Sequence, residues 1–171
     1  MLGNPALAAH LYGLHMRVRR AEDDDREFLF EMARLACGLD DRPLPSPGDP
    51  SVLALLPRPT DLAVVAVDDR DHCVGAGWSH SHEPPLVLDD RGQPIPEITM
   101  AVREDVRGRG IGGRLLEELA SEATKRFSAL ALNVHLCNPA VRLYIRGGFK
   151  VAGKGRGWYG VAMFRPLDEP Q

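Results

Sequence analysis

A segment rich in glycine and arginine, residues 106–119 with the sequence VRGRGIGGRLLEEL, carries the strongest chemical signal in the chain. Its four glycines and three arginines come just before a run of leucine and glutamate that predicts a helix. The first turn of a helix has unpaired backbone N–H groups and a partial positive charge. Glycine lets a large ligand reach those amides because no Cβ is in the way, and arginine adds donors suited to phosphate. The segment therefore predicts a binding site for a pyrophosphate group.

Several kinds of phosphate-binding loop share this physics, and residue spacing separates them. Gly108, Gly110 and Gly113 satisfy G-x-G-x-x-G, but a dinucleotide site also needs an acidic residue about 20 positions further on. The next apolar stretch, ALALNVHL, carries no acidic residue. A P-loop needs Lys followed by Ser or Thr, whereas Gly113 is followed by Arg114 and Leu115. The spacing therefore argues against both nucleotide-binding loops.

The segment resembles the acyl-CoA loop of the GNAT superfamily of N-acetyltransferases, whose first signature is R/Q-x-x-G-x-G/A. Residues 107–112, RGRGIG, fit this signature without a gap, and EITMAV at 97–102 looks like the strand that precedes it. NPAVRLY at 138–144, followed by Gly148 and Phe149, resembles the second signature, N-x-x-A-x-x-L/F-Y-x-x-x-GF. Both signatures lie at the separation that is typical of the family.

The resemblance implies that acetyl-CoA is the co-substrate and that backbone amides of the loop bind its pyrophosphate. Main-chain groups of the preceding strand would pair with the pantetheine arm, much as an added strand does. Asn138, which is also a candidate helix cap, would contact the same arm. Tyr144, otherwise a core aromatic, would lie beside the thioester sulfur. The implied cofactor-binding residues are Met100, Ala101, Val102, Arg107, Gly108, Arg109, Gly110, Ile111, Gly112, Gly113, Asn138 and Tyr144.

Acetyl transfer to an amine requires a proton acceptor. An alkyl amine has a pKa near ~10, so at neutral pH most of it is protonated and unreactive. Glu97 is the first candidate for the general base, because it lies at the start of the strand that precedes the loop. His80, His82 and His135 are alternatives, since an unperturbed imidazole titrates near ~6.5.

The departing thiolate needs a proton donor, and the tetrahedral oxyanion needs a hydrogen-bond donor. Thiols have a pKa near ~8.5 and phenols near ~10, so Tyr144 is predicted to return a proton to the thiolate. A backbone N–H freed by splaying of the strand, around Ala101 or Val102, is predicted to stabilise the oxyanion. Cys137 is next to Asn138, but nothing in its surroundings indicates an activated thiol, and no covalent acyl-enzyme is predicted.

The composition argues against several other classes of protein. Hydrophobic residues make up 44% of the chain and charged residues 26%, as in soluble globular proteins. A net charge of −3 gives no general attraction to nucleic acid or to an anionic membrane, and no apolar run approaches the roughly 20 residues that cross a bilayer. Three widely spaced cysteines favour reduced thiols in the cytoplasm. His80 and His82 lack a nearby third ligand, so no metal is predicted.

The elements that must position these residues follow from apolar periodicity and from turn residues. An order of β-α-(α)-β-β-β-α-β-α-β-β predicts an α/β (α+β) fold: a mixed, mostly antiparallel central sheet of about six to seven strands, with helices on both faces. This is also the GNAT-like fold. Residues 1–15 are expected to be an N-terminal extension and residues 16–171 a single N-acetyltransferase domain. The predicted strands are residues 16–20, 61–67, 72–79, 96–103, 130–136, 149–153 and 159–166, and the predicted helices 23–38, 51–56, 111–127 and 138–147.

The acceptor is expected to lie across the central strand from the coenzyme, among the least regular segments: residues 40–50, 51–56, 82–94 and 155–159. These segments carry both signs of charge. A polyamine, an aminoglycoside, an amino acid and a peptide N-terminus or lysine therefore all remain open, and a homodimer is compatible with the family resemblance. The alternative function is a catalytically silent acyl-CoA-binding sensor.

Overall fold

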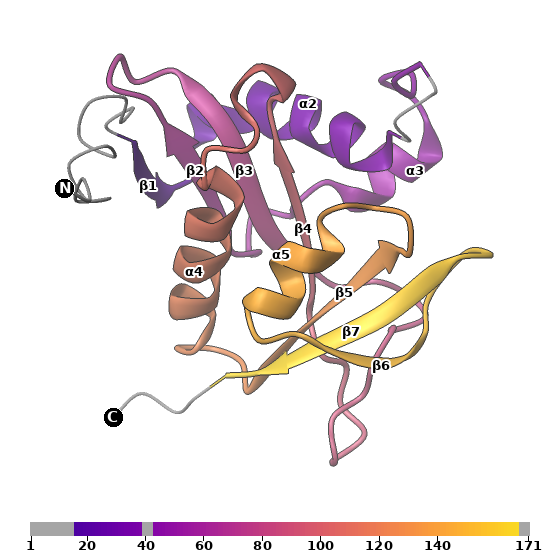
Figure 1. Cartoon of the computed structure of the whole chain (residues 1–171). Coiled ribbons are helices and arrows are strands. Elements are labelled where there is room, and N and C mark those ends of the chain that lie inside the picture. Colours follow the sequence, from indigo (N-terminus) through magenta and orange to yellow (C-terminus); the bar gives the residue numbers. More distant parts are fainter. Residues whose placement is uncertain (1–15, 39–42, 168–171) are drawn as a thin grey trace, which may run out of the picture.

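One seven-stranded sheet runs through the computed structural model, which describes residues 16–38 and 43–167 (Figure 1). The expected extension at residues 1–15 lies outside the described residues. The strand order is β1-β2-β3-β4-β5-β7-β6, and every neighbouring pair is antiparallel except the parallel pair of β4 and β5. The prediction of a mixed, mostly antiparallel sheet is confirmed. The strands are β1 (Arg17–Arg20), β2 (Ala63–Val67), β3 (Cys73–His80), β4 (Glu97–Val102), β5 (Ala129–His135), β6 (Lys150–Lys154) and β7 (Gly160–Pro166).

Helices cover both faces of the sheet, as the element order predicted (Figure 1). On one face, α2 (Arg26–Cys37) and α3 (Pro50–Leu55) pack on an apolar cluster that includes Val65 and Trp78. On the other face, α4 (Ile111–Ala123) and α5 (Val141–Arg146) cover a larger cluster. Each strand in the middle of the sheet therefore has its alternating side chains buried on both sides.

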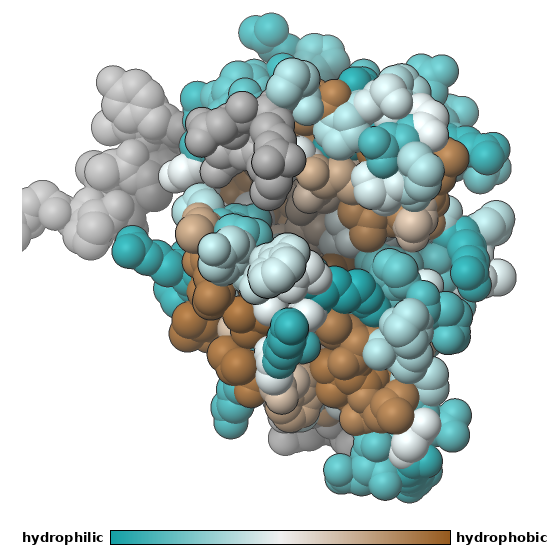
Figure 2. Space-filling view, turned by 90° about the vertical axis from the view of Figure 1, so that its right-hand side faces the viewer, coloured by the Kyte–Doolittle hydropathy of each residue, from teal (hydrophilic) through white to brown (hydrophobic). Residues whose placement is uncertain are grey.

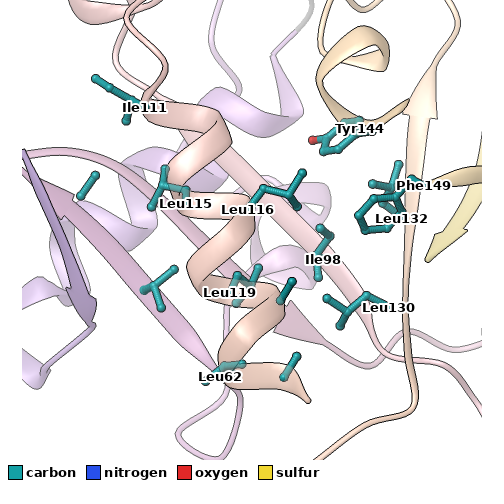
Figure 3. Packing of buried hydrophobic residues seen from close by; sticks show 14 of the residues in the cluster. Leu62, Ile98, Ile111, Leu115, Leu116, Leu119, Leu130, Leu132, Tyr144 and Phe149 are labelled. Carbon is teal, nitrogen blue, oxygen red and sulfur yellow. The ribbon is translucent and has the colours of Figure 1, made fainter. Parts of the chain in front are cut away.

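The helix that follows the glycine- and arginine-rich segment forms because its apolar residues recur at helical spacing. Ile111, Leu115 and Leu119 line one face of α4 and are buried in the same apolar cluster as Ile98 of β4 and Leu130 of β5 (Figure 3). Burying each such side chain contributes about 1.5–3 kcal/mol. The packed stripe fixes the helix on the sheet, and so it fixes where the start of the helix lies.

Two predicted helices are longer than those in the structure. The helix predicted over 138–147 begins at Val141, because the Asn138 side chain accepts a hydrogen bond from the amide of Ala140 (2.9 Å) and holds the chain in a turn. The helix predicted to reach Phe127 ends at Ala123 and continues as turns. The predicted starts and ends of the other elements differ from the structure by a few residues at most.

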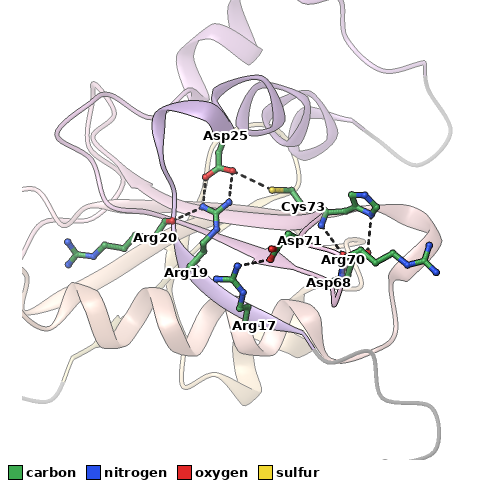
Figure 4. A network of polar contacts seen from close by, with 9 residues as sticks. Arg17, Arg19, Arg20, Asp25, Asp68, Arg70, Asp71 and Cys73 are labelled. Atoms are coloured by element: carbon green, nitrogen blue, oxygen red, sulfur yellow. Dashed lines mark hydrogen bonds and ion pairs between the residues drawn. The ribbon is translucent and has the colours of Figure 1, made fainter.

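An ion pair between the buried Asp25 and the half-buried Arg19 joins β1 to the beginning of α2 (Figure 4). The Asp25 carboxylate accepts hydrogen bonds from both terminal nitrogens of Arg19 (2.6 and 2.9 Å), from the amide of Glu22 (2.8 Å) and from the thiol of Cys73 (3.4 Å). Burial acts to raise the pKa of Asp25, but the hydrogen bonds from these donors outweigh it and hold the pKa below its ordinary value of 3.8. The folded chain therefore favours the ionised carboxylate.

This pair predicts a pH dependence of stability. The folded-state pKa of Asp25 is lower than the unfolded one, so the stabilisation is present above about pH 4 and is lost as the pH falls through the folded-state pKa. We expect the free energy of unfolding to fall less steeply below about pH 5 in Asp25→Asn than in the wild type. Urea unfolding at a series of pH values measures this. Asp71→Asn, which alters an exposed ion pair with Arg17, is the control and should follow the wild type; equal slopes for all three proteins would contradict the prediction.

Candidate active site

The glycine loop, residues 107–110, connects β4 to α4 and needs glycine at two positions. Gly108 and Gly110 have φ angles of 77° and 81°, in the left-handed region that favours glycine. A Cβ added at either position would have no heavy atom within 4 Å, so the space around the loop is open. Gly110 is also the N-cap of α4, whose first-turn amides lack partners within the helix. The loop thus presents backbone amides on an open surface.

The residues that follow the loop have a packing role. Ile111 is buried in the core below α4, so only its backbone can serve a ligand. A Cβ on Gly112 would lie 3.0 Å from Cδ2 of Leu143, and one on Gly113 would lie 3.9 Å from Cδ1 of the same residue. These two glycines let α5 approach α4 closely. The coenzyme contacts predicted for their amides stay predictions.

Two of the three arginines in the segment bind backbone carbonyl groups. The Nε of Arg107 donates to the carbonyl oxygen of Val102 (3.0 Å), which ties the glycine loop to the end of β4. Arg114 donates to the carbonyl oxygen of Met16 (2.9 Å). The side chain of Arg109 is exposed. The pyrophosphate prediction therefore depends mainly on the amides of the loop, with Arg109 as the exposed cation beside them.

The central strands β4 and β5 separate soon after they meet. Their register contains one pair, Glu97 with Ala131, and the amide of Ala131 donates to the carbonyl oxygen of Pro96 (2.9 Å). At the other end of β4, the amide of Arg103 donates to β3 at Val74 (3.0 Å). Backbone groups alternate sides along a strand. The amides of Met100 and Val102 therefore face the gap between β4 and β5, whereas Ala101 turns its backbone toward β3.

Tyr144 lies on α5 above this gap. Its ring is buried and packs edge-on against Phe149, with the ring centroids 5.9 Å apart. Its hydroxyl points away from Phe149 and toward α4 (Figure 3). Burial raises the pKa of Tyr144 to about 12, so the phenol keeps its proton at every physiological pH.

Glu97 is buried at the point where β4 and β5 separate, with 3% of its surface exposed. Its carboxylate forms a two-pronged ion pair with Arg156 from the turn between β6 and β7 (2.5 and 2.7 Å). It also accepts a hydrogen bond from the amide of Leu86 (3.2 Å). Both carboxylate oxygens are thus already bonded, so the predicted role of Glu97 as a base would require the carboxylate to lose its charge within this ion pair.

The three histidines that the sequence offers as alternative bases have different surroundings. His80 is buried at the end of β3, directly opposite Glu97 in the antiparallel register. The His82 ring lies with its centroid 6.2 Å from that of His80. The Nδ1 atom of His135 accepts a hydrogen bond from the amide of Cys137 (3.2 Å), and its ring packs edge-on against Tyr159. His80 is therefore the histidine nearest to Glu97 in the sheet register.

Asn138 is exposed in the turn before α5, where its side chain accepts the hydrogen bond from Ala140 described above. The interpretation of Asn138 as a residue that shapes the start of this helix has direct support. Its predicted contact with the pantetheine arm stays a prediction. Cys137 beside it is exposed and unpaired as a thiol.

The segments expected to frame the acceptor are joined by two side chains. Trp78 of β3 donates from its indole nitrogen to the carbonyl oxygen of Leu55 in α3 (2.7 Å). Arg156 donates to the carbonyl oxygen of Pro84 (2.8 Å), so the turn after β6 holds the 82–94 loop. Figure 2 views the molecule from this side and shows apolar areas separated by hydrophilic ones. Trp158 in the same turn is 97% exposed. Of the expected frame, residues 40–42 lie outside the described part of the chain.

Sequence reasoning missed the partnership of Arg156 with Glu97. No local pattern could reveal it, because the two residues are 59 positions apart. The turn that presents Arg156 is held by Asn133 of β5, whose side-chain oxygen accepts a hydrogen bond from the Arg156 amide (2.8 Å). Within residues 16–38 and 43–167, no group of three or more His, Cys, Asp or Glu is placed to hold a metal ion. No helix of this described part is long and apolar enough to span a membrane.

Comparison with known proteins identifies relatives with this arrangement. A family model described as an acetyltransferase (GNAT) domain matches residues 59–151, more than half of the chain. A 5-NmdU N-acetyltransferase of Pseudomonas phage PaMx11 is 39% identical over 67 residues, which cover 39% of this chain and 46% of the phage protein. The match thus spans less than half of that relative.

Solved structures have the same fold over nearly their whole length. A GCN5-related N-acetyltransferase from Kribbella flavida superimposes with a TM-score of 0.68 at 25% identity, covering 89% of this chain and 98% of the other. A phosphinothricin acetyltransferase from Sinorhizobium meliloti, solved with AcCoA, gives a TM-score of 0.65 at 20% identity, covering 91% and 93%.

Proposed function

Because the chain belongs to the family of acetyltransferase (GNAT) domains, we propose that it moves an acetyl group from acetyl-CoA to a primary amine by direct attack in a ternary complex. The observation that carries the proposal is the open glycine loop beside the gap between β4 and β5. An acyltransferase that uses acetyl-CoA needs a surface that binds a charged pyrophosphate and a narrow slot that takes an extended arm. The glycine loop matches the first need, and the gap between β4 and β5 matches the second. The related Sinorhizobium enzyme, which has this fold, was solved with AcCoA.

The residues that would hold the coenzyme follow from this geometry. The amides of Gly108, Gly110 and the first turn of α4 would bind the pyrophosphate, with Arg109 alongside. The backbone groups of Met100 and Val102 would pair with the pantetheine arm, and one of their amides would serve as the oxyanion donor. When bound, acetyl-CoA supplies an activated acyl group.

Tyr144 is the proposed proton donor for sulfur. Its buried phenol is protonated at neutral pH, and its hydroxyl points toward α4 across the gap (Figure 3). A raised pKa makes the phenol a weaker acid in the isolated protein, so the proton would move only as negative charge develops on sulfur. The proton acceptor for the amine is a separate group, and Glu97 and the histidines are its candidates.

Measuring CoA release with a panel of amines tests the proposed function. The panel includes a polyamine, an aminoglycoside, an amino acid, and a peptide that has a free N-terminus and a lysine side chain. It also includes 5-NmdU, which the name of the phage relative gives as its substrate. Turnover that depends on the amine and yields an N-acetyl product is the expected result. Tight acetyl-CoA binding with no turnover on any amine would instead support the sensor. Competition with NAD and ATP tests whether the loop prefers the coenzyme.

The glycine loop gives a prediction with a matched control. Gly110 and Gly92 both have a positive φ, 81° and 75°, with no heavy atom near an added Cβ. Valine at either position introduces similar backbone strain, on the order of 1–2 kcal/mol. We expect Gly110→Val to weaken acetyl-CoA binding at least tenfold and Gly92→Val to leave it unchanged, as measured by calorimetry. Equal affinities would mean that the loop is only a tight turn.

A further inference from the structure

His80 has a buried nitrogen with no hydrogen-bond partner. Only 5% of the residue is exposed, and its Nδ1 atom is the one buried side-chain N or O atom without a partner in the described part of the chain. An unsatisfied buried polar atom costs about 1–3 kcal/mol, so such atoms in proteins usually meet water or a ligand. Nδ1 of His80 is therefore an acceptor that can bind a proton, a water molecule or a ligand.

The other nitrogen of the ring fixes how His80 is oriented. Its Nε2 lies 3.0 Å from the hydroxyl oxygen of Thr99 on β4, on the same face of the sheet. When Nε2–H donates to this hydroxyl, the lone pair of the neutral imidazole is on Nδ1. Burial lowers the pKa of His80 below its ordinary value of 6.5, which keeps the ring neutral at pH 7.

The sheet register places His80 beside the point where β4 and β5 separate. His80 and Glu97 are directly opposed in the register of β3 and β4, and Glu97 is the last residue at which β4 pairs with β5. The gap proposed to take the coenzyme arm begins at the next residue of β4. The 82–94 loop and the turn that carries Arg156 meet at the same point.

The rival base at this point is already engaged. Both oxygens of Glu97 accept charge-assisted hydrogen bonds from Arg156, at 2.5 and 2.7 Å. For Glu97 to take a proton, the carboxylate must lose the negative charge that strengthens both bonds within this buried pair. The Nδ1 of His80 can take a proton without breaking any hydrogen bond.

We propose that Nδ1 of His80 accepts the proton that the acceptor amine loses, directly or through one water molecule. This inference rests on the proposed function. The amine nitrogen forms a bond to the acetyl carbonyl carbon, and the carbonyl electron pair moves to oxygen to give a tetrahedral oxyanion. The oxyanion then collapses as the bond from carbon to sulfur breaks, and that electron pair leaves with sulfur. The nitrogen proton goes to His80, and sulfur takes a proton from Tyr144. His80 then releases its proton to solvent, and Tyr144 regains one.

The proposal predicts the acidic side of the pH profile. Besides burial, the charged and titratable groups that act on His80 are Glu97 and Asp61, which favour its protonation, and His82 and Arg156, which oppose it. Burial and these charges together leave the pKa of His80 in the folded protein below 6.5. Because protonated His80 cannot accept a further proton, kcat/KM should fall only as the pH drops below that value. Deprotonation of the amine near pH ~10 shapes the alkaline side and stays separate from this limb.

His80→Gln is the decisive variant, measured with an amine that the wild type acetylates. The amide nitrogen of glutamine can reach the position of Nε2 and keep the contact with Thr99, but it does not titrate. We expect kcat/KM at neutral pH to fall about 100-fold and the acidic limb to disappear. Acetyl-CoA affinity should stay unchanged. His72→Gln, an exposed histidine in the turn between β2 and β3, is the matched control and should keep the wild-type profile.

A measurement without turnover protects the test against a variant that misfolds. The imidazole NMR signal that persists in each single His→Gln variant of the other five histidines reports His80, and its titration in the wild-type protein alone should have a midpoint below 6.5. That midpoint should coincide with the acidic limb of kcat/KM. A His80 signal that titrates at or above 6.5, or far from the limb, would overturn the proposal even if the variant cannot be purified.

The outcomes separate this inference from the proposed function. A wild type that binds acetyl-CoA but acetylates no amine overturns both. A wild type that turns over, with an acidic limb that survives in His80→Gln, overturns only the role of His80. A limb that is lost in His82→Gln but kept in His80→Gln assigns the proton to His82. Loss of the limb in His80→Gln alone, with a matching NMR midpoint, supports the proposal.

Discussion

Arg156→Met is expected to lower the free energy of unfolding by about 3 kcal/mol, because it leaves the buried carboxylate of Glu97 without its partner. The Glu97 side chain is 4% exposed, and few other donors reach it: the described contacts leave it the amide of Leu86. The Arg156 side chain is 31% exposed, so water can enter after its removal, and this places the estimate at the lower end for a broken buried pair. Urea unfolding at pH 7 measures the change.

The double variant Glu97→Met/Arg156→Met tests whether the loss of stability comes from the unpaired carboxylate of Glu97 or from the removal of the Arg156 side chain itself. Replacing both members of a buried ion pair by apolar residues is often neutral for stability. We therefore expect the double variant to recover most of the lost free energy. Arg103→Met, which removes an exposed pair with Asp105, is the control and should change stability by less than about 1 kcal/mol. Additive effects of Glu97→Met and Arg156→Met would show that the two residues are not coupled.

Tyr144→Phe is expected to lower kcat about 100-fold while leaving acetyl-CoA affinity within about twofold of the wild type. Phenylalanine keeps the ring that packs against Phe149, so the fold should be unaffected. The change removes only the hydroxyl, which is the proposed source of the proton for sulfur. Because the pKa of Tyr144 is about 12, its protonation should add no feature to the pH profile at physiological pH.

Steady-state kinetics and calorimetry with acetyl-CoA check this prediction together. Tyr159→Phe, on a side chain that is 62% exposed, is the matched control for acetyl-CoA affinity, which should equal that of the wild type. An unchanged kcat in Tyr144→Phe would mean that solvent or another group protonates sulfur. An equal loss of affinity and turnover would instead assign the hydroxyl to ground-state binding.

Much of the fold could be predicted because its determinants are local. Strand alternation in residues 97–102 and the four-residue spacing of Ile111, Leu115 and Leu119 are read directly from the order of residues. The exact start of α5 could not be read, because it depends on a side-chain hydrogen bond of Asn138 that competes with the helix. The glycine loop was predictable since Gly108 and Gly110 adopt backbone angles that other residues avoid.

The sequence by itself determined the order of the elements, the mixed sheet and the glycine loop before α4, because periodicity and backbone preference act over a few neighbouring residues. Only the tertiary structure decided which charges meet and which titratable groups are buried. Glu97 is bound by an arginine 59 positions away, and His80 is enclosed with an unpartnered nitrogen. Pairing and desolvation depend on segments that are distant in the sequence and meet only when the sheet closes around them.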